Sequence, residues 1–325
     1  MKIQVASASI PGSAHLGQST VLIGKNNQDA MRVSPELGPS RIWTGENGPL
    51  IALVSDGVSS APDAEVGSKL AVRLYNTTLT RELMRFQTIL VKMMDEGLKL
   101  KSDPLPKSFW DRVDNNALAP LSTLMMALGP DDSGFRRTLN DLFIFTMLGL
   151  VHSEKFGTWI FGPKGSDGVF SINGEVTILT PQLGNKPISP CYRFVPNEFQ
   201  EQPDLMQTVV HKYLPPGELE SFVIGTDGLE HYIKAEGKKM PGRDEVVHPL
   251  SAFWEDEEFY NGDSLQLYFR QLNTESCRLH KPTPDEEKLG KKAKLLREGR
   301  LLLDDTTVII GRRIVDESLA IGGVE

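Results

Sequence analysis

The stretch IALVSDGVSSAPDAEVGSKLAV, residues 51–72, combines a short apolar run, an aspartate-glycine pair and a helical pattern. The run from Ile51 to Val54 has the composition of a buried strand and ends just before Asp56-Gly57. Beyond Pro62, apolar residues recur near the spacing of an amphipathic helix. A carboxylate at the end of a buried strand is expensive to desolvate unless a cation accompanies it. The sequence therefore predicts that Asp56 meets a positive partner.

Aspartates lie at or near the ends of several other apolar runs. They occur in KNNQDA (25–30), GPKGSDG (162–168), FVIGTDG (222–228) and LLLDDTTVII (301–310). An aspartate at such a position, taken alone, is typical of an ordinary turn. Together, carboxylates at strand ends can converge on one edge of a sheet, where they repel one another unless divalent cations bind. Because oxygen ligands predominate and no His or Cys spacing suits zinc, the pattern favours Mg²⁺ or Mn²⁺.

Composition restricts the class of protein. The chain has 325 residues, a net charge of −8, 39% hydrophobic residues and two cysteines. It is long enough to bury a large core without disulfides, and its negative charge argues against a nucleic-acid partner. No segment has the length and apolarity of a membrane span or a signal peptide. We therefore expect a cytoplasmic protein with no membrane partner and reduced thiols.

The order of predicted elements indicates an α+β domain. Helices are expected after Pro62, over 83–100, near 263–272 and near 285–298, whereas 103–134 has no clear pattern. Because strands cluster between helix groups and no linker divides the chain, antiparallel sheets covered by helices are the simplest arrangement. Strands are predicted at 3–10, 51–54, 142–151, 157–162, 168–174, 175–179, 221–228 and 301–313.

The same motifs, in this order, resemble those of the metal-dependent type 2C (PPM) serine/threonine protein phosphatases, and most closely their bacterial branch. The carrying segments are SIPGSAH…KNNQDA, ALVSDGVSSAPDAEVGSKLAV, GSDGVFSINGE, FVIGTDGLE and LLLDDTTVII. The resemblance implies a four-layer α-β-β-α sandwich of two antiparallel sheets flanked by helices. It also implies one domain over 1–313, with an insert or flap-like region at about 229–300, and a tail at 314–325.

The resemblance further implies a centre of two Mg²⁺ or Mn²⁺ ions that activates a water for attack on phosphorus. By position, Asp56 would bridge both ions and Gly57 would offer its carbonyl, while Asp227 and Asp304 would complete one coordination shell. These three aspartates would be the catalytic residues. Gln28 and Asp29 would act through metal-bound waters, and Asp167 matches an aspartate associated with a third, weaker ion.

Three positions depart from the family pattern. Val58 stands where many members carry a histidine proposed as the general acid. Gly24 stands where members commonly carry an arginine that binds the substrate phosphate; Lys25 or His15 could take over, although Lys lacks the bidentate fork of Arg. The segment GPKGSDG, around Asp167, is altered from the family pattern.

The sequence supports a leading function and leaves alternatives open. The leading hypothesis is a phosphatase of phosphoserine and phosphothreonine in proteins that opposes a cognate kinase. One alternative is a pseudophosphatase that serves as a binding or scaffold module, and another is a phosphatase of small phosphoesters. The basic stretch KLGKKAKLLREGR (288–300) could attract an acidic partner, although a charge run is more often a solvated helix face.

Overall fold

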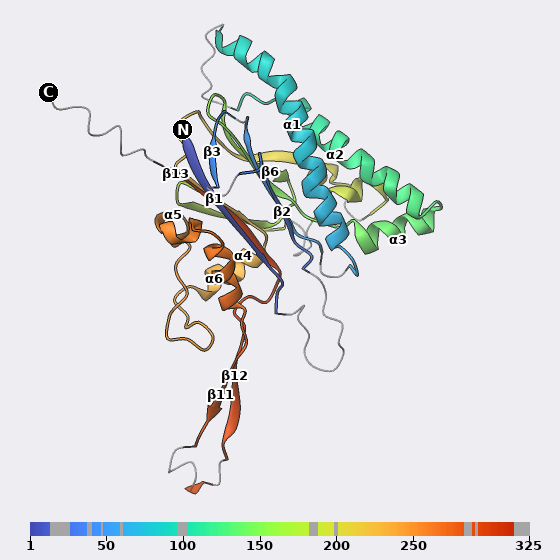
Figure 1. The fold of residues 1–325 in the computed structure, drawn as a ribbon. Helices are drawn as coiled ribbons and strands as arrows, with labels where there is room; N and C mark the ends of the chain where they lie inside the picture. The colour runs from blue at the N-terminus through green and yellow to red at the C-terminus, as the bar shows by residue number, and fades with distance from the viewer. Residues whose placement is uncertain are drawn as a thin grey trace, which may run out of the picture.

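The structure is a computed structural model in which two antiparallel sheets stack face to face (Figure 1). It describes residues 1–13, 27–37, 41–46, 48–58, 61–95, 103–181, 188–197, 201–282, 288–289 and 292–314. The first sheet has the order β3-β1-β13-β10-β7-β8 and the second the order β2-β4-β5-β6-β9. A separate two-stranded sheet pairs β11 with β12.

The strands of the first sheet come from both ends of the chain. Because β1 pairs with β13 along its whole length, from Lys2 opposite Ile314 to Ile10 opposite Thr306, the two ends are joined in one sheet. The strands are β1 (Lys2–Ile10), β3 (Ile42–Thr44), β7 (Gly168–Ile172), β8 (Glu175–Leu179), β10 (Ser221–Gly225) and β13 (Thr306–Ile314).

The second sheet is contributed by the middle of the chain. Its strand β4 is buried at all six positions, as the apolar run around Ile51 predicts. Alternate residues of β4 contact different layers: Leu50, Ala52 and Val54 face the other sheet, whereas Ile51 and Leu53 face the helices. The strands are β2 (Ala30–Ser34), β4 (Leu50–Ser55), β5 (Leu148–Ser153), β6 (Gly157–Pro163) and β9 (Thr208–Leu214).

Helices cover the outer face of each sheet, so the molecule has four layers (Figure 1). The second sheet packs against α1 (Glu65–Asp95), α2 (Lys107–Leu128) and α3 (Asp132–Leu142). The first sheet packs against α4 (Gly228–Ala235), α5 (Ala252–Glu255) and α6 (Ser264–Leu272), with the 3₁₀ helix η3 (Glu257–Tyr260). A third apolar core lies between the sheets. The predicted α+β sandwich is confirmed.

Several predicted elements differ from the observed ones. The two helices expected between 62 and 100 form one helix, α1, because Leu79, Leu83 and Leu90 continue one apolar face across the predicted break. The patternless segment 103–134 holds α2 and most of α3. The helix predicted near 285–298 is wrong over Lys294–Glu298, which forms strand β12 and pairs with β11 (Ser276–His280). This part of the charge run is therefore not a helix face.

The hairpin between β7 and β8 follows its sequence signal. Asn173 and Gly174 both have positive φ angles, 51° and 83°, as a tight two-residue turn requires. The strand predicted over 142–151 starts only at Leu148, because 143–147 is an irregular segment beside Asp56. Among the described helices, none is both long and apolar enough to cross a membrane.

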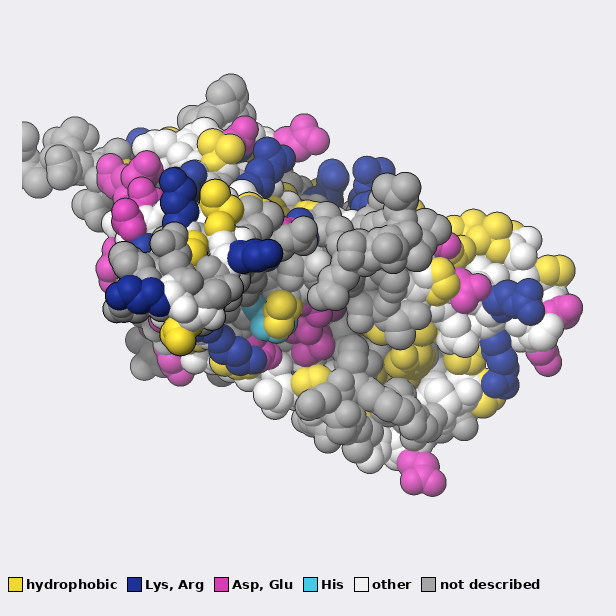
Figure 2. All heavy atoms as spheres, turned by 90° about the horizontal axis from the view of Figure 1, so that it is seen from below, with side chains coloured by type: hydrophobic (Ala, Val, Ile, Leu, Met, Phe, Trp, Pro, Cys, Tyr) yellow, Lys and Arg dark blue, Asp and Glu magenta, His cyan; other side chains and the backbone are white. Residues whose placement is uncertain are grey.

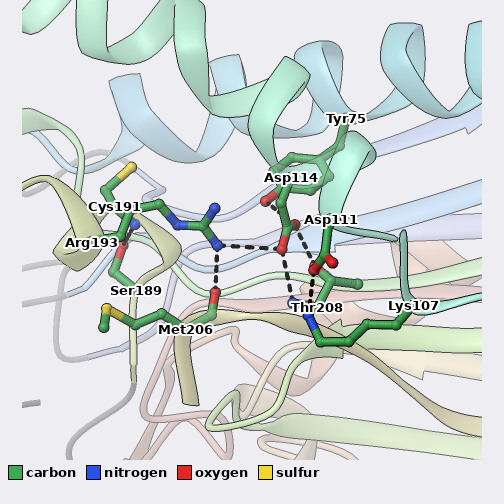
Figure 3. Close-up of polar contacts among 9 residues, drawn as sticks. All are labelled: Tyr75, Lys107, Asp111, Asp114, Ser189, Cys191, Arg193, Met206 and Thr208. Atoms are coloured by element: carbon green, nitrogen blue, oxygen red, sulfur yellow. Dashed lines mark hydrogen bonds and ion pairs between the residues drawn. The ribbon is translucent and has the colours of Figure 1, made fainter. Parts of the chain in front are cut away.

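A buried aspartate joins the helical layer to the edge of the second sheet (Figure 3). Asp114 of α2 is 2% exposed and accepts hydrogen bonds from the backbone N–H of Thr208 (2.9 Å) and from its hydroxyl (2.6 Å). The Tyr75 hydroxyl of α1 donates to it at 3.1 Å, and Arg193 of η1 (Pro190–Phe194) lies 3.3 Å away. Arg193 also donates to the carbonyl of Met206, in η2 (Pro203–Met206), at 2.9 Å. This carboxylate therefore holds four segments together.

Candidate functional site

The five aspartates named from the sequence lie at one end of the sandwich. In the first sheet, Gly225 at the end of β10 pairs with Val308 near the start of β13 and Val169 near the start of β7. In the second sheet, Ser55 at the end of β4 pairs with Ala30 at the start of β2. The segments that flank these strand ends carry Asp29, Asp56, Asp167, Asp227 and Asp304.

Mutual repulsion shows that these carboxylates are neighbours. Burial, followed by the charges of Asp29, Asp227 and Asp167, raises the pKa of Asp56 well above its usual range. Burial, followed by the charges of Asp167 and Asp304, raises the pKa of Asp227 to about 8. One cluster therefore contains aspartates of both sheets.

Two further carboxylates show the same effect to a smaller degree. Burial raises the pKa of Asp29 to about 7, although hydrogen bonds from its neighbours, including Thr226, oppose this shift. Burial also raises the pKa of Asp167 to about 6, against a hydrogen bond from Thr146. A cluster that resists ionisation in this way favours any ligand that brings positive charge.

Four buried oxygens in the cluster have no hydrogen-bond partner within the part of the chain that the structure describes. Buried polar atoms are almost always paired, so unpaired oxygens that gather at one place suggest an absent ligand. Among the described residues, no three His, Cys, Asp or Glu side chains are placed so that they could hold a metal ion as they stand. The cluster is thus a set of convergent donors and not a closed coordination shell. The atoms are Gln28 Oε1, Asp29 Oδ1, Asp167 Oδ1 and Asp227 Oδ1.

Gln28 is held in place from several directions. Its backbone N–H donates to Asp305 Oδ2 at 2.6 Å, and its carbonyl accepts from the Gly57 N–H at 3.2 Å and from the Ser68 hydroxyl. Its side-chain Nε2 donates to the carbonyl of Ala61 at 3.1 Å, which leaves Oε1 as the unpaired atom. This oxygen is therefore positioned by β4, α1 and the segment before β13.

Asp305 has a structural role that the sequence analysis missed. Its two oxygens accept the backbone N–H groups of Gly12 and Gln28, each at 2.6 Å, and the residue is 1% exposed. Its neighbour Asp304 is the one whose charge acts on Asp227 and Asp167. Nothing in the pair Asp304-Asp305 separates the two roles, because they depend on which way each side chain points in the folded chain.

Two threonines that the sequence analysis did not name position the cluster. The Thr226 hydroxyl donates to Asp29 Oδ2 at 2.7 Å and accepts the Thr307 N–H at 3.1 Å, so it joins the two sheets. The Thr146 N–H donates to the Asp56 carbonyl at 2.8 Å. A threonine directly before an Asp-Gly pair was visible in FVIGTDG, but only the contact reveals its role.

Close packing surrounds Gly57. A Cβ atom on this residue would lie 2.9 Å from Ala64, so a larger side chain would displace the turn that leads into α1. Val58 is half-buried and packs on the helical side of the second sheet. His15 and Lys25, predicted to bind the substrate phosphate, lie outside the described residues, as does Gly24.

Comparison with known proteins identifies the family. A sequence model described as protein phosphatase 2C matches residues 16–265, which is well over half of the chain. The chain belongs to the protein phosphatase 2C family. It is therefore a phosphoprotein phosphatase, as the order of the aspartate motifs predicts. The matched region contains Asp29, Asp56, Asp167 and Asp227, and Asp304 lies beyond it.

Solved structures of the same family resemble this chain along nearly all of its length. A serine/threonine phosphatase from Staphylococcus aureus is 10% identical, with a TM-score of 0.43 and 96% of both chains covered. A serine-threonine phosphatase 2C from Toxoplasma gondii is 13% identical, with a TM-score of 0.46, 96% of this chain covered and 95% of the other. Among curated protein sequences, none matches significantly. The family assignment accordingly rests on the sequence model.

Proposed function

We propose that this protein phosphatase 2C is a Mg²⁺- or Mn²⁺-dependent enzyme that hydrolyses phosphoserine and phosphothreonine in proteins. The observation that carries the proposal is the group of unpaired, buried oxygens of Gln28, Asp29, Asp167 and Asp227 at one end of the sandwich. Carboxylates that repel one another destabilise a fold when no cation is bound. A chain that brings them together therefore gains a function from their negative charge, and we propose that this function is the binding of divalent cations.

The donor set fits hard divalent cations. All the candidate ligands are oxygens, and Mg²⁺ and Mn²⁺ prefer carboxylate, carbonyl and water ligands. We assign Asp56, Gly57, Asp227 and Asp304 to two ions. Gln28 and Asp29 would act through bound water, and Asp167 would serve a third ion.

The fold would hold the proposed metal ligands in place before the substrate binds. When bound, two such cations would lower the pKa of a shared water toward about 7 and neutralise charge on the phosphate. The buried strand β4 holds Asp56 rigid at the sheet end, and the Thr226 hydroxyl fixes Asp29 so that Oδ1 remains available. Val58 cannot donate a proton, so another group must protonate the departing serine or threonine oxygen.

The alternatives predict different behaviour. A pseudophosphatase would bind partners without turnover, and Val58 and Gly24 are the residues that favour it. A phosphatase of small phosphoesters would not prefer phosphopeptides over an aryl phosphate. The retained cluster argues against the first alternative, because a scaffold gains nothing from buried carboxylates that repel one another.

Metal binding and turnover together test the proposal. We expect calorimetry to show Mn²⁺ binding to the wild type, and weaker binding to Asp227→Asn and Asp304→Asn. A phosphothreonine peptide and p-nitrophenyl phosphate should both be hydrolysed with Mn²⁺, and neither with a chelator. Unchanged Mn²⁺ binding in both variants would refute the ligand assignment. A folded protein that hydrolyses neither substrate with Mn²⁺ or with Mg²⁺ would favour the alternative of a scaffold module.

The pKa values predict how pH affects stability when metal is removed. Asp227 titrates near pH 4 in an unfolded chain, whereas burial and its neighbours raise its pKa to about 8 in the fold. Between these values the folded state binds more protons than the unfolded state, so stability falls as pH rises. With a chelator present, we expect the Tm to decrease between pH 5 and 8.

The matching variants make this pH prediction specific. Asp227→Asn removes one titrating group and should flatten the decrease, whereas Asp111→Asn, at a partly exposed position on α2, should leave it unchanged. Saturating Mn²⁺ should weaken the decrease, because a cation binds the ionised carboxylates. A Tm of the chelated wild type that rises from pH 5 to 8 would contradict the prediction. Differential scanning fluorimetry measures all four cases.

A further inference from the structure

A basic hairpin projects from the molecule at its lower end in Figure 1. We define the basic arm as the sequence 276–300; its described part is 276–282, 288–289 and 292–300 and contains β11 and β12. The two strands pair with each other over five residues, from Ser276 opposite Glu298 to His280 opposite Lys294. Neither strand joins the two large sheets. An isolated two-stranded hairpin is only marginally stable in water. Contact with a partner would supply the packing that such an arm lacks.

The charge of the basic arm opposes that of the rest of the chain. Its sequence contains eight Lys or Arg and four Asp or Glu, in a protein whose net charge is −8. Lys281, Lys288 and Lys292 are exposed, and so are the apolar side chains of Leu279 (58%) and Leu289 (77%). The arm therefore presents cationic and apolar groups to a partner, whereas the remaining surface carries the negative excess.

The base of the arm is joined to the segments that form the carboxylate cluster. The Leu301 N–H donates to the carbonyl of Leu272 in α6 at 3.1 Å, and the Leu302 N–H donates to Asn273 Oδ1 at 3.3 Å. Asn273 in turn donates to the carbonyl of Pro11 at 2.8 Å. Asp304 follows two residues after Leu302, so the arm and the cluster share one anchored segment.

The arm lies at the same end of the molecule as this segment. Figure 2 shows the molecule from below, the direction in which the hairpin points; an acidic group lies near the centre of this face, and Lys and Arg side chains lie around it, mixed with acidic ones. A five-residue strand spans about 17 Å. The arm can therefore contact chain that flanks a residue bound at the cluster.

We propose that the basic arm docks acidic segments flanking the phosphorylated residue of a protein substrate. This inference rests on the proposed function, since it names the substrate class for the same site. Complementary charge at an interface speeds association and selects partners. Attraction between acidic flanks and the basic arm would offset the repulsion between the phosphate and the acidic body. The exposed Leu279 and Leu289 supply apolar contact beside the lysines.

A protein segment fits the arm better than a nucleic acid does. The arm sequence contains no Phe, Tyr or Trp on which bases could stack. A nucleic acid long enough to extend beyond the arm would also meet the acidic body, whereas nucleic-acid-binding domains are usually basic overall. A short acidic peptide avoids this repulsion, because only its flank needs to contact the arm.

The test compares two triple variants with equal charge change. The arm variant carries Lys281→Gln, Lys288→Gln and Lys292→Gln. The control carries Lys92→Gln, Lys107→Gln and Lys155→Gln, at exposed positions on α1, on α2 and in the turn between β5 and β6. The probe is a fluorescein-labelled peptide with a run of six Glu beside a threonine, and a matched peptide carries Gln in place of Glu. Fluorescence anisotropy measures binding without requiring turnover.

We expect the arm variant to bind the Glu peptide about fivefold to tenfold more weakly than the wild type at low salt, as three exposed ion pairs predict. High salt should remove the difference, and the control variant should bind as the wild type does. With the phosphothreonine form, kcat/KM should fall by a similar factor, while kcat/KM for p-nitrophenyl phosphate stays within about twofold. The Gln peptide should not distinguish the proteins.

Some outcomes would overturn the docking proposal. Equal binding of the Glu peptide by the arm variant and the wild type would do so, as would an equal loss in the control. Tighter binding of single-stranded RNA or phosphatidylserine vesicles than of the Glu peptide, lost in the arm variant, would assign the arm to another partner. Peptide binding does not depend on catalysis, so it can succeed where turnover fails, and the two proposals fail separately.

Discussion

Replacing Asp56 with Asn should lower kcat/KM for p-nitrophenyl phosphate by about a thousandfold or more, which corresponds to about 4 kcal/mol of transition-state stabilisation. Asp56 is the carboxylate whose pKa three other aspartates, Asp29, Asp227 and Asp167, raise further after burial. Asn keeps the shape of the side chain and removes its charge. The variant should therefore fold, yet bind divalent cations poorly.

A second readout separates this effect from misfolding. Loss of one repelling charge should raise the Tm of the chelated protein, so activity and stability should move in opposite directions. Asp63→Asn, the same substitution at an exposed position before α1, should keep kcat/KM within about twofold. If Asp56→Asn retains more than a tenth of the wild-type kcat/KM, our assignment of Asp56 to the centre of the metal site is wrong.

Replacing Asp114 with Ala should lower the free energy of unfolding by about 3–5 kcal/mol, since removal of one member of a buried ion pair leaves the other uncompensated. Arg193 would lose its carboxylate, and Tyr75 and both donors of Thr208 would lose their acceptor. Because these groups come from three segments that Asp114 joins to α2, the loss affects the contact between the helical layer and the edge of the second sheet (Figure 3).

Asp111→Ala provides the matched control on the same helix. Asp111 lies three residues earlier on α2, is 42% exposed at its side chain and pairs with Lys107 at 2.6 Å. An exposed pair of this kind contributes only about 0.2–1 kcal/mol. Urea denaturation followed by circular dichroism measures both variants. Equal destabilisation would show that burial of the Asp114 network does not produce the effect.

The sequence alone was sufficient for the features that depend on local pattern. The buried run ending before Asp56 predicted a central strand, Asn173-Gly174 predicted a hairpin, and five ordered motifs predicted the family. Local pattern failed where tertiary packing overrides propensity. Helix α1 continues through its predicted break because its apolar face packs along the second sheet and α2. The charged segment around Lys294 became a strand because β11 lies beside it.

Only the tertiary structure decided how the acidic residues divide their roles. Asp304 and Asp305 are adjacent and identical in the sequence, yet Asp305 accepts two backbone N–H groups and its charge acts on Asp29. The charge of Asp304 acts instead on Asp227 and Asp167. Asp114 was indistinguishable from a surface aspartate until α2 placed it against Thr208. Sequence determined which residues could carry negative charge at strand ends. Packing determined which of them stay unpaired, because hydrogen-bond satisfaction depends on neighbours that are remote in the chain.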